Sequence, residues 1–275
     1  MCIFRGHRAS AIMRLCFSRE AMGMAGRVGV IGGSGARFAS GLSLGEGAVV
    51  TTPWGDTSGP LREGSLGGYP LLWLARHGEH HTLAPHRVNY RANIHALRAC
   101  GATCVIGLNT VGGIAPAALP GTLWLPEQIV DYTTGRESSF HDGSLLPLQH
   151  QEFAEPYDAD LRGVLARAAA EAGIPVVFGG TYGCTQGPRL ETAAEIRRMR
   201  RDGCDLVGMT GMPEAALARE AGLSYASLSM VVNPAAGMSD EPITMEAILR
   251  EAEGCMVKSL LLIARALAML DQVRG

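Results

Sequence analysis

Polar residues stand directly after short apolar runs, at positions where the strands of an open α/β sheet would end. Arg76 and His77 follow the run at 69–75, and Asn233 follows the small and β-branched residues at 225–232. In such a sheet the ligand lies outside the carboxyl ends of the strands. An Arg beside a His suits an oxyanion, because a guanidinium can hold phosphate with two parallel N–H bonds. The amide of Asn233 offers a donor and an acceptor, which suits the edge of a planar heterocycle.

Two turns rich in small residues also follow apolar runs. Gly-Gly-Ser-Gly at 32–35 follows 27–31, and Asn-Thr-Val-Gly-Gly at 109–113 follows 103–108. The exposed backbone N–H groups of such turns can form an anion-binding nest. A plain tight turn explains the first motif equally well. A dinucleotide fingerprint explains it less well, because the spacing of Gly29, Gly32 and Gly35 is wrong for that motif.

The histidines after residue 76 invite a metal site, since His77 and His81 are four residues apart. That spacing has meaning on a helix, whereas Gly78 and Pro85 predict a loop here. No set of carboxylates or cysteines accompanies the histidines. We therefore expect no metal and no cofactor. Asn233 also has a simpler interpretation, because Asn before Pro commonly starts a turn.

Composition sets the class of protein. The chain has 275 residues, of which 47% are hydrophobic, and its 24 basic residues nearly balance 26 acidic ones. This balance favours neither nucleic acid nor an anionic membrane as a partner. The seven cysteines include no CxxC pair, so a reducing cytoplasm is expected. Residues 1–24 are Arg-rich and precede the first strand pattern, which predicts an N-terminal extension, either transit-like or the result of an upstream start codon.

Strand and helix patterns alternate along the rest of the chain. Strands are expected at 27–31, 48–51, 69–75, 103–108, 175–182, 205–209 and 225–232, and helices at 89–99, 158–172, 193–201, 214–221 and after Thr244. This alternation predicts one domain at 25–275 with a doubly wound, mostly parallel, twisted central α/β sheet and helices on both faces.

Five motifs, taken in order, resemble the trimeric purine nucleoside phosphorylase and methylthioadenosine phosphorylase family. They are Gly-Gly-Ser-Gly at 32–35, Ala-Arg-His-Gly at 75–78, Val-Asn-Tyr-Arg-Ala-Asn at 88–93, Gly-Pro-Arg-Leu-Glu-Thr-Ala-Ala-Glu at 187–195 and Gly-Met-Thr-Gly-Met-Pro-Glu at 208–214. The resemblance implies that phosphate, as a co-substrate, cleaves a purine N-glycosidic bond without a metal. It also implies a homotrimer that acts on a small-molecule nucleoside.

The resemblance further assigns roles to residues. The phosphate ligands of the family correspond to Ser34, Arg76, His77, Asn109, Thr110 and Thr210. Met209 falls where the family contacts the ribose, and His150 falls where a residue reaches the neighbouring subunit's site. Asn233, Glu191 and His77 are the residues that we expect to act on the reacting groups.

The base pocket departs from the methylthioadenosine branch, which places carboxylates where this chain has Asn233 and Ala235. A carboxylate can only accept, whereas an amide can donate to a 6-oxo group. Glu191 falls where 6-oxopurine phosphorylases receive the N1–H of the base. These features favour hypoxanthine or guanine over adenine. An ordinary acid in the first turn of a helix remains the alternative for Glu191, and Leu190 replaces the aromatic ring usually found against the base.

The residues expected to contact the sugar differ from those of typical purine nucleoside phosphorylases. Met245 falls where purine nucleoside phosphorylases carry a histidine for the 5′-hydroxyl, and Ile248 lies one turn further on. An apolar wall suits a methylthio group, so 5′-methylthioinosine is the expected nucleoside. Alternatively, both residues belong to the core of an amphipathic helix. Phosphorolysis of methylthioadenosine, or of inosine and guanosine, is the main alternative activity. A hydrolytic nucleosidase and a non-catalytic dinucleotide-binding module are alternatives with less support from the sequence.

Overall fold

The computed structural model describes residues 26–33 and 41–274. The predicted extension at residues 1–24 lies outside these ranges. The strands, in chain order, are β1 (Arg27–Gly32), β2 (Leu42–Ala48), β3 (Thr51–Thr52), β4 (Gly55–Asp56), β5 (Leu61–Leu66), β6 (Tyr69–Ala75), β7 (Ala102–Gly113), β8 (Leu123–Leu125), β9 (Gln128–Asp131), β10 (Val176–Phe178), β11 (Thr181–Cys184), β12 (Leu206–Gly208) and β13 (Ser224–Pro234). The helices are α2 (Tyr90–Ala99), α3 (Ala159–Glu171), α4 (Ala193–Arg201), α5 (Glu214–Glu220) and α6 (Met245–Arg274), with a 3₁₀ turn at Pro85–Arg87.

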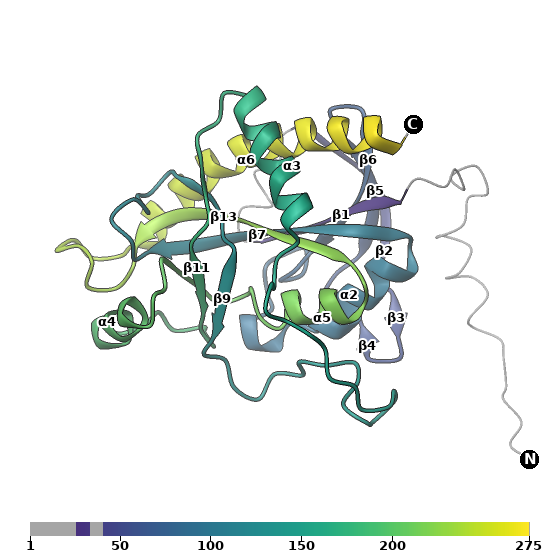
Figure 1. Ribbon diagram of the computed structural model, residues 1–275, viewed down its shortest axis with the longest axis horizontal. Helices are drawn as coiled ribbons and strands as arrows, with labels where there is room; N and C mark the ends of the chain where they lie inside the picture. Colours follow the sequence, from purple (N-terminus) through teal and green to yellow (C-terminus); the bar gives the residue numbers. More distant parts are fainter. Residues whose placement is uncertain (1–25, 34–40, 275) are drawn as a thin grey trace, which may run out of the picture.

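A mixed, mostly parallel sheet forms the centre of the molecule (Figure 1). Its main path runs β10-β8-β13-β7-β1-β6-β5-β2, and β12, β11 and β9 branch from β7. The central strands β6, β1, β7 and β13 are all parallel, whereas β5 and β2 add an antiparallel edge. Parallel strands end at the same edge of a sheet, so the residues that follow β6, β7 and β13 lie near one another.

Helices cover both faces of the sheet, as the alternating pattern predicted. Helices α3 and α6 lie on one face, and α2 and α5 lie on the other (Figure 1). Side chains cap the helix starts: Asn89 accepts from the backbone of α2, Asp158 from that of α3, and Thr192 forms a capping box with Glu195 at α4. Such caps satisfy N–H groups that a helix cannot bond internally.

Alternate side chains of β7 and β13 pack into different cores, because successive residues of a strand point to opposite faces. Val105 and Tyr225 belong to the core under α2 and α5. Ile106 and Leu228 belong to the core under α3 and α6. Both faces of these strands are buried, which explains their nearly continuous apolar sequences.

Several predicted boundaries were wrong. The strand expected at 48–51 lies earlier, at Leu42–Ala48, and β5 was not predicted. The turn expected at 109–113 is the second half of β7, because Gly112 and Gly113 pair with both β12 and β13. A Cβ on Gly113 would lie 1.8 Å from the carbonyl oxygen of Ala118, so this strand tolerates only glycine there. Gly112 and Gly113, which predicted a turn in the sequence, instead allow neighbouring backbone segments to pack closely.

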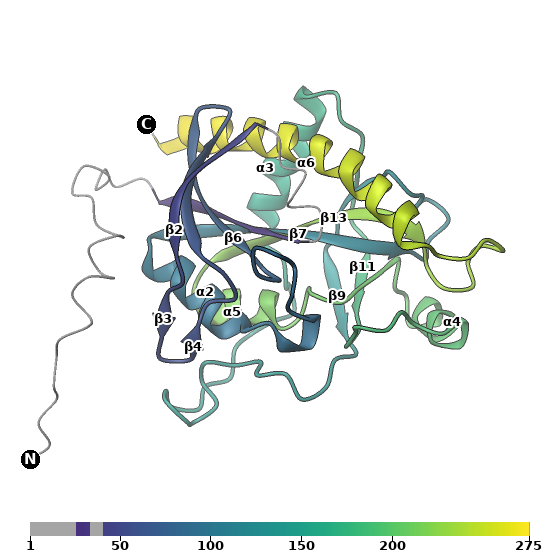
Figure 2. The ribbon, with the colours of Figure 1, turned by 180° about the vertical axis from the view of Figure 1, so that it is seen from behind.

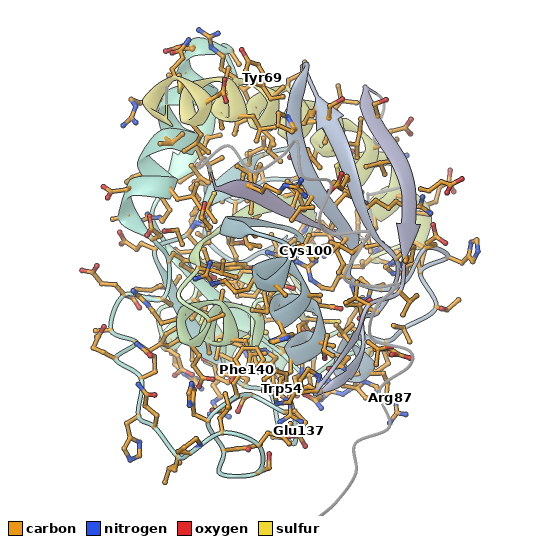
Figure 3. The ribbon with its side chains drawn as sticks, turned by 90° about the vertical axis from the view of Figure 1, so that its right-hand side faces the viewer. Trp54, Tyr69, Arg87, Cys100, Glu137 and Phe140 are labelled. Atoms are coloured by element: carbon orange, nitrogen blue, oxygen red, sulfur yellow. The ribbon has the colours of Figure 1, made fainter. Side chains whose placement is uncertain are left out.

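A long segment, residues 132–158, joins β9 to α3 and runs past α5 and α2 at the lower side of the molecule (Figures 1 and 2). Phe140 fixes this segment against the β3–β4 hairpin: its ring meets that of Trp54 edge-on, with centroids 4.7 Å apart (Figure 3). Arg91 of α2 donates to Ser139 and Asp142 of the same segment. In the part of the chain that the structure describes, no helix combines the length and apolar character needed to cross a membrane.

Candidate active site

One pocket of about 430 Å³ lies at the carboxyl ends of the central strands. Met245 and Ile248, in the first turn of α6, are among its lining residues, and this end of α6 lies at the left of Figure 1. Most of the predicted site residues line it: Arg76, His77, Thr110, Leu190, Glu191, Met209, Thr210, Asn233, Ala235, Met245 and Ile248. They come from β7, β13 and α6, from the segments that directly follow β6, β12 and β13, and from the loop before α4, which are widely separated in sequence. Their individual roles stay predictions.

Arg76 is held in place by a buried ion pair. It is 0% exposed, and its Nε and Nη2 each donate to a carboxylate oxygen of Glu214 at 2.7 Å. Its Nη1 donates to the carbonyl of Leu108 at 2.9 Å, and Tyr225 donates to Glu214. Burial acts to lower the pKa of Arg76, but the pair with Glu214 outweighs it and raises the pKa. The double-donor edge expected to hold phosphate is therefore occupied by Glu214, which leaves the remaining Nη hydrogens for a ligand.

His77 is neutral at neutral pH. Burial, followed by the charge of Arg76, lowers its pKa from 6.5 to about 4. Its Nδ1 lies 2.8 Å from the carbonyl oxygen of Leu83, which can only accept. The proton therefore sits on Nδ1, and Nε2 carries the lone pair that can accept from a ligand.

A chain of buried hydrogen bonds supports Thr210. The Thr210 hydroxyl donates to Oδ1 of Asn109 at 2.8 Å, and Nδ2 of Asn109 donates to the Ser227 hydroxyl at 2.8 Å. Strand β12 is antiparallel to β7, so its carboxyl end returns alongside Asn109 and Thr110. Asn109 is 0% exposed and is not among the lining residues. Asn109 supports Thr210 in this structure, and its expected role as a phosphate ligand stays a prediction.

The predicted base end of the pocket contains Glu191 and Asn233. Thr185 donates to Glu191 Oε1 at 2.6 Å, and Asn233 Nδ2 donates to the carbonyl of Pro234 at 2.6 Å. Strand β13 shifts register against β7 between Val231 and Asn233. Such a bulge bends a strand and redirects its side chains. Asn233 therefore belongs to the end of β13 rather than to a separate turn.

Several apolar side chains also line the pocket. Met245 and Ile248 lie in the first turn of α6 and line the pocket together with Ile243 and Met209. Met245 is 65% exposed, so it is not a core residue of the helix, whereas Ile248 also packs against the core. Leu190 is 45% exposed.

Asn109 and His150 are not among the lining residues of this pocket. Ser34 lies outside the described residues, and His150 is exposed on the segment before α3. Other contributors were not predicted from the sequence. Glu214 belongs to a quoted motif but received no role, and the stretch 82–85 after His77 lines the pocket. Among the described residues, no group of three His, Cys, Asp or Glu side chains could hold a metal ion.

Glu191 also lines a neighbouring polar hollow of about 610 Å³. Thr185, Gln186 and Arg189 lie along this second hollow. The larger hollow contains neither Arg76 nor His77, so the smaller pocket is the better candidate for chemistry.

Comparison with known proteins places the chain in a family. The family model described as "Phosphorylase superfamily" matches residues 27–268. A probable S-methyl-5′-thioinosine phosphorylase of Xanthomonas campestris pv. campestris is 54% identical over 225 residues, which cover 82% of this chain and 90% of that protein. A 6-oxopurine nucleoside phosphorylase of Pyrococcus furiosus is 41% identical over 228 residues, 81% of this chain and 85% of that protein.

The fold agrees with this assignment. The structure of methylthioadenosine phosphorylase from Schistosoma mansoni in complex with adenine superposes with a TM-score of 0.84 at 33% identity, covering 90% of this chain and 92% of that one. A family match over most of the chain and a shared fold agree with the five motifs. The chain belongs to the phosphorylase superfamily.

Proposed function

We propose that this chain catalyses the phosphorolysis of S-methyl-5′-thioinosine to hypoxanthine and 5-methylthioribose 1-phosphate. One observation carries the proposal: a single pocket is lined by Arg76 and His77, by Glu191 and Asn233, and by the apolar side chain of Met245. These groups suit phosphate, a 6-oxopurine and a methylthio substituent respectively. The relatives named for methylthioinosine and 6-oxopurine phosphorolysis support the same activity.

The reaction needs charge stabilisation rather than a covalent enzyme nucleophile. A phosphate oxygen bonds to C1′ of the sugar while the C1′–N9 bond breaks, and the bonding electron pair leaves with the purine. Positive charge builds on the sugar, and bound phosphate stabilises it. Negative charge builds on the purine, and the amide of Asn233 can donate to it. Preorganised groups of this kind supply several kcal/mol of transition-state stabilisation.

Base selection follows from donor and acceptor types. A 6-oxopurine presents O6 as an acceptor and N1–H as a donor. Nδ2 of Asn233 has a second hydrogen beyond the one given to Pro234, and it can donate to the base. Glu191 can accept N1–H, since Thr185 binds only its Oε1 among the described residues. Adenine would leave these groups unpaired, at roughly 1–3 kcal/mol each.

Selection at C5′ follows from the apolar wall. Ile248, Ile243 and Met245 provide no hydrogen-bond partner for a 5′-hydroxyl, so inosine is the poorer substrate. Apolar pockets reject an added hydroxyl by about 10²-fold at most. Phosphorolysis of inosine is therefore expected as a weak side activity, and methylthioadenosine as a poor substrate because of the base end.

We also propose that the active form is a homotrimer in a reducing cytoplasm and that residues 25–275 form one domain. Met245 lines the pocket but is 65% exposed, and His150 is exposed on a long segment, which supports completion of the site by a neighbouring subunit. Cys184, Cys204 and Cys255 are buried free thiols, which supports the compartment.

Product analysis tests the proposed activity. Purified protein is incubated with S-methyl-5′-thioinosine with and without phosphate, and the products are separated by chromatography and followed by ³¹P NMR. We expect hypoxanthine and a sugar 1-phosphate in equal amounts, and neither product without phosphate. Free methylthioribose without phosphate would instead identify a hydrolase.

A further inference from the structure

Arg136 lies in the segment after β9 and donates to two separate loops at once. Its Nη2 donates to the carbonyls of Thr185 at 3.1 Å and Gln186 at 2.9 Å. Its Nη1 donates to the carbonyl of Met209 at 2.9 Å and to that of Met212. Its Nε donates to the side-chain oxygen of Gln186 at 3.1 Å. All five N–H bonds of the guanidinium thus have an acceptor.

The two loops follow neighbouring strands of the sheet, because β11 pairs with β12 and the Thr185 N–H donates to the carbonyl of Gly208 at 2.8 Å. Thr185 begins the loop that carries Glu191, and its hydroxyl donates to that carboxylate at 2.6 Å. Met209 follows β12 and lines the pocket next to Thr210. Arg136 itself is not among the residues that line the pocket. Any effect that it has on the substrate must therefore act through these two loops.

The chemistry of the contact requires arginine. Among the described residues, Arg136 has no carboxylate within ion-pair distance, so backbone carbonyls receive its charge. A planar guanidinium presents five donors in a fixed fork, whereas a lysine ammonium is a compact charge with three donors on a flexible stem. Lysine can bond one loop well but cannot hold both in a fixed relative position. The ring of Tyr90, 5.6 Å from Cζ, limits the movement of the guanidinium further.

We propose that Arg136 is a positioning residue that fixes the base-binding loop at 185–191 relative to the turn at 209–212. The proposal rests on the proposed function, because base discrimination depends on the placement of Glu191. A misplacement of about 1 Å in such a site can reduce the rate about 10²-fold.

The first test uses the ratio of kcat/KM for methylthioinosine to that for methylthioadenosine. This ratio does not depend on the fraction of active protein. We expect Arg136→Gln and Arg136→Lys each to lower the ratio at least tenfold and to raise the KM for methylthioinosine. A purely structural role would lower Tm and leave both quantities unchanged. Recovery of the wild-type ratio by Arg136→Lys would also overturn the proposal, because charge alone would then suffice.

Arg91→Lys provides the matched control. Arg91 donates to Ser139 and to Asp142 in the same segment but contacts neither loop of the site. We expect this variant to lower Tm without altering the selectivity ratio. An equal loss of selectivity in Arg91→Lys would mean that the whole segment, rather than Arg136, positions the site.

Hydrogen exchange tests the proposal without relying on catalysis. In Arg136→Gln, amides in peptides covering 185–192 and 209–214 should exchange at least tenfold faster, whereas Arg91→Lys should leave both peptides unchanged. Unchanged exchange in Arg136→Gln would overturn the proposal. A wild-type protein inactive on every nucleoside would contradict the proposed function alone, because the exchange result would still decide the role of Arg136.

Discussion

A single amide, that of Asn233, carries much of the proposed preference for a 6-oxopurine. Asn233→Asp replaces a donor with an acceptor while keeping the size of the side chain. We expect kcat/KM for methylthioinosine to fall and that for methylthioadenosine to rise. One mismatched group of roughly 1–3 kcal/mol corresponds to about 5- to 150-fold in the ratio of the two values. Steady-state rates with both nucleosides measure this ratio of kcat/KM values. Asn233→Ser is the control, because it removes the amide without adding charge.

An unchanged ratio in Asn233→Asp would show that Asn233 does not read the base. A similar loss in both variants, without a gain for methylthioadenosine, would mean that the residue only shapes β13. Its bond to Pro234 and its place beside the register shift make that alternative concrete.

His77 predicts a pH dependence of stability. The pKa falls from 6.5 to about 4 in the folded protein, chiefly through burial, so between these values the unfolded chain binds the proton and the folded protein does not. Above pH 6.5 His77 is neutral in both states and does not change the free energy of unfolding. As the pH falls towards 4, protonation of the unfolded chain lowers the free energy of unfolding. Between pH 7 and pH 5 the loss is about 2 kcal/mol.

Urea unfolding of wild type and His77→Asn at pH 7 and pH 5 measures this contribution. An asparagine amide can still donate to the carbonyl of Leu83, so the loop contact is retained. We expect the variant to lose about 2 kcal/mol less than wild type on acidification. His95, whose pKa burial also lowers, is present in both proteins and does not affect the difference. Equal losses would contradict a neutral, buried His77.

Side chains that line the pocket could be predicted from the sequence, whereas their hydrogen-bond and ion-pair partners could not. Arg76, His77, Glu191 and Asn233 were predicted because each stands in a recognisable motif or after a strand, and all four line the pocket. The carboxylate that holds Arg76 comes from Glu214, 138 residues further along the chain, and no local pattern reveals such a pairing. Arg136 was not predicted for the same reason, since most of its acceptors are backbone carbonyls, which any residue type can provide.

At the scale of elements, the Arg76–Glu214 pair ties the end of β6 to the start of α5. Removing one partner of a buried pair leaves an uncompensated charge, which costs about 3–5 kcal/mol. We expect Glu214→Gln to lower the free energy of unfolding by this amount. The paired replacement of Arg76→Met with Glu214→Leu should recover most of the stability while phosphorolysis is lost. Chemical denaturation of the three proteins measures these values.

If Glu214→Gln were as stable as wild type, the ion pair would not be the tie between β6 and α5 that the geometry indicates. If the double variant were active, Arg76 would not be needed for phosphate. The two outcomes separate the structural role of the pair from its proposed role in the site.

Helices were predicted more accurately than strand ends. The starts of α2, α3 and α4 carry a capping side chain, which is a local signal, and the structure agrees within a residue. The ends of β7 and β13 depend on pairing with each other and with β12, which is a tertiary property. The bulge at Val232, which sets the direction of Asn233, leaves no signal in the sequence.

At the scale of the whole molecule, the proposed trimer predicts a sedimenting mass three times the 29.0 kDa of the chain. Analytical ultracentrifugation at catalytic concentrations measures it. His150→Ala should keep this mass and raise the KM for methylthioinosine about tenfold, the equivalent of about 1.4 kcal/mol. A monomer with full activity would contradict completion of the site by a neighbouring subunit.

The most direct test of the central claim compares initial rates with methylthioinosine, methylthioadenosine and inosine at saturating phosphate and without phosphate. We expect phosphate-dependent turnover with the highest kcat/KM for methylthioinosine. Preference for methylthioadenosine would contradict the interpretation of Glu191 and Asn233. Preference for inosine would contradict that of Met245 and Ile248, and equal rates without phosphate would contradict phosphorolysis itself.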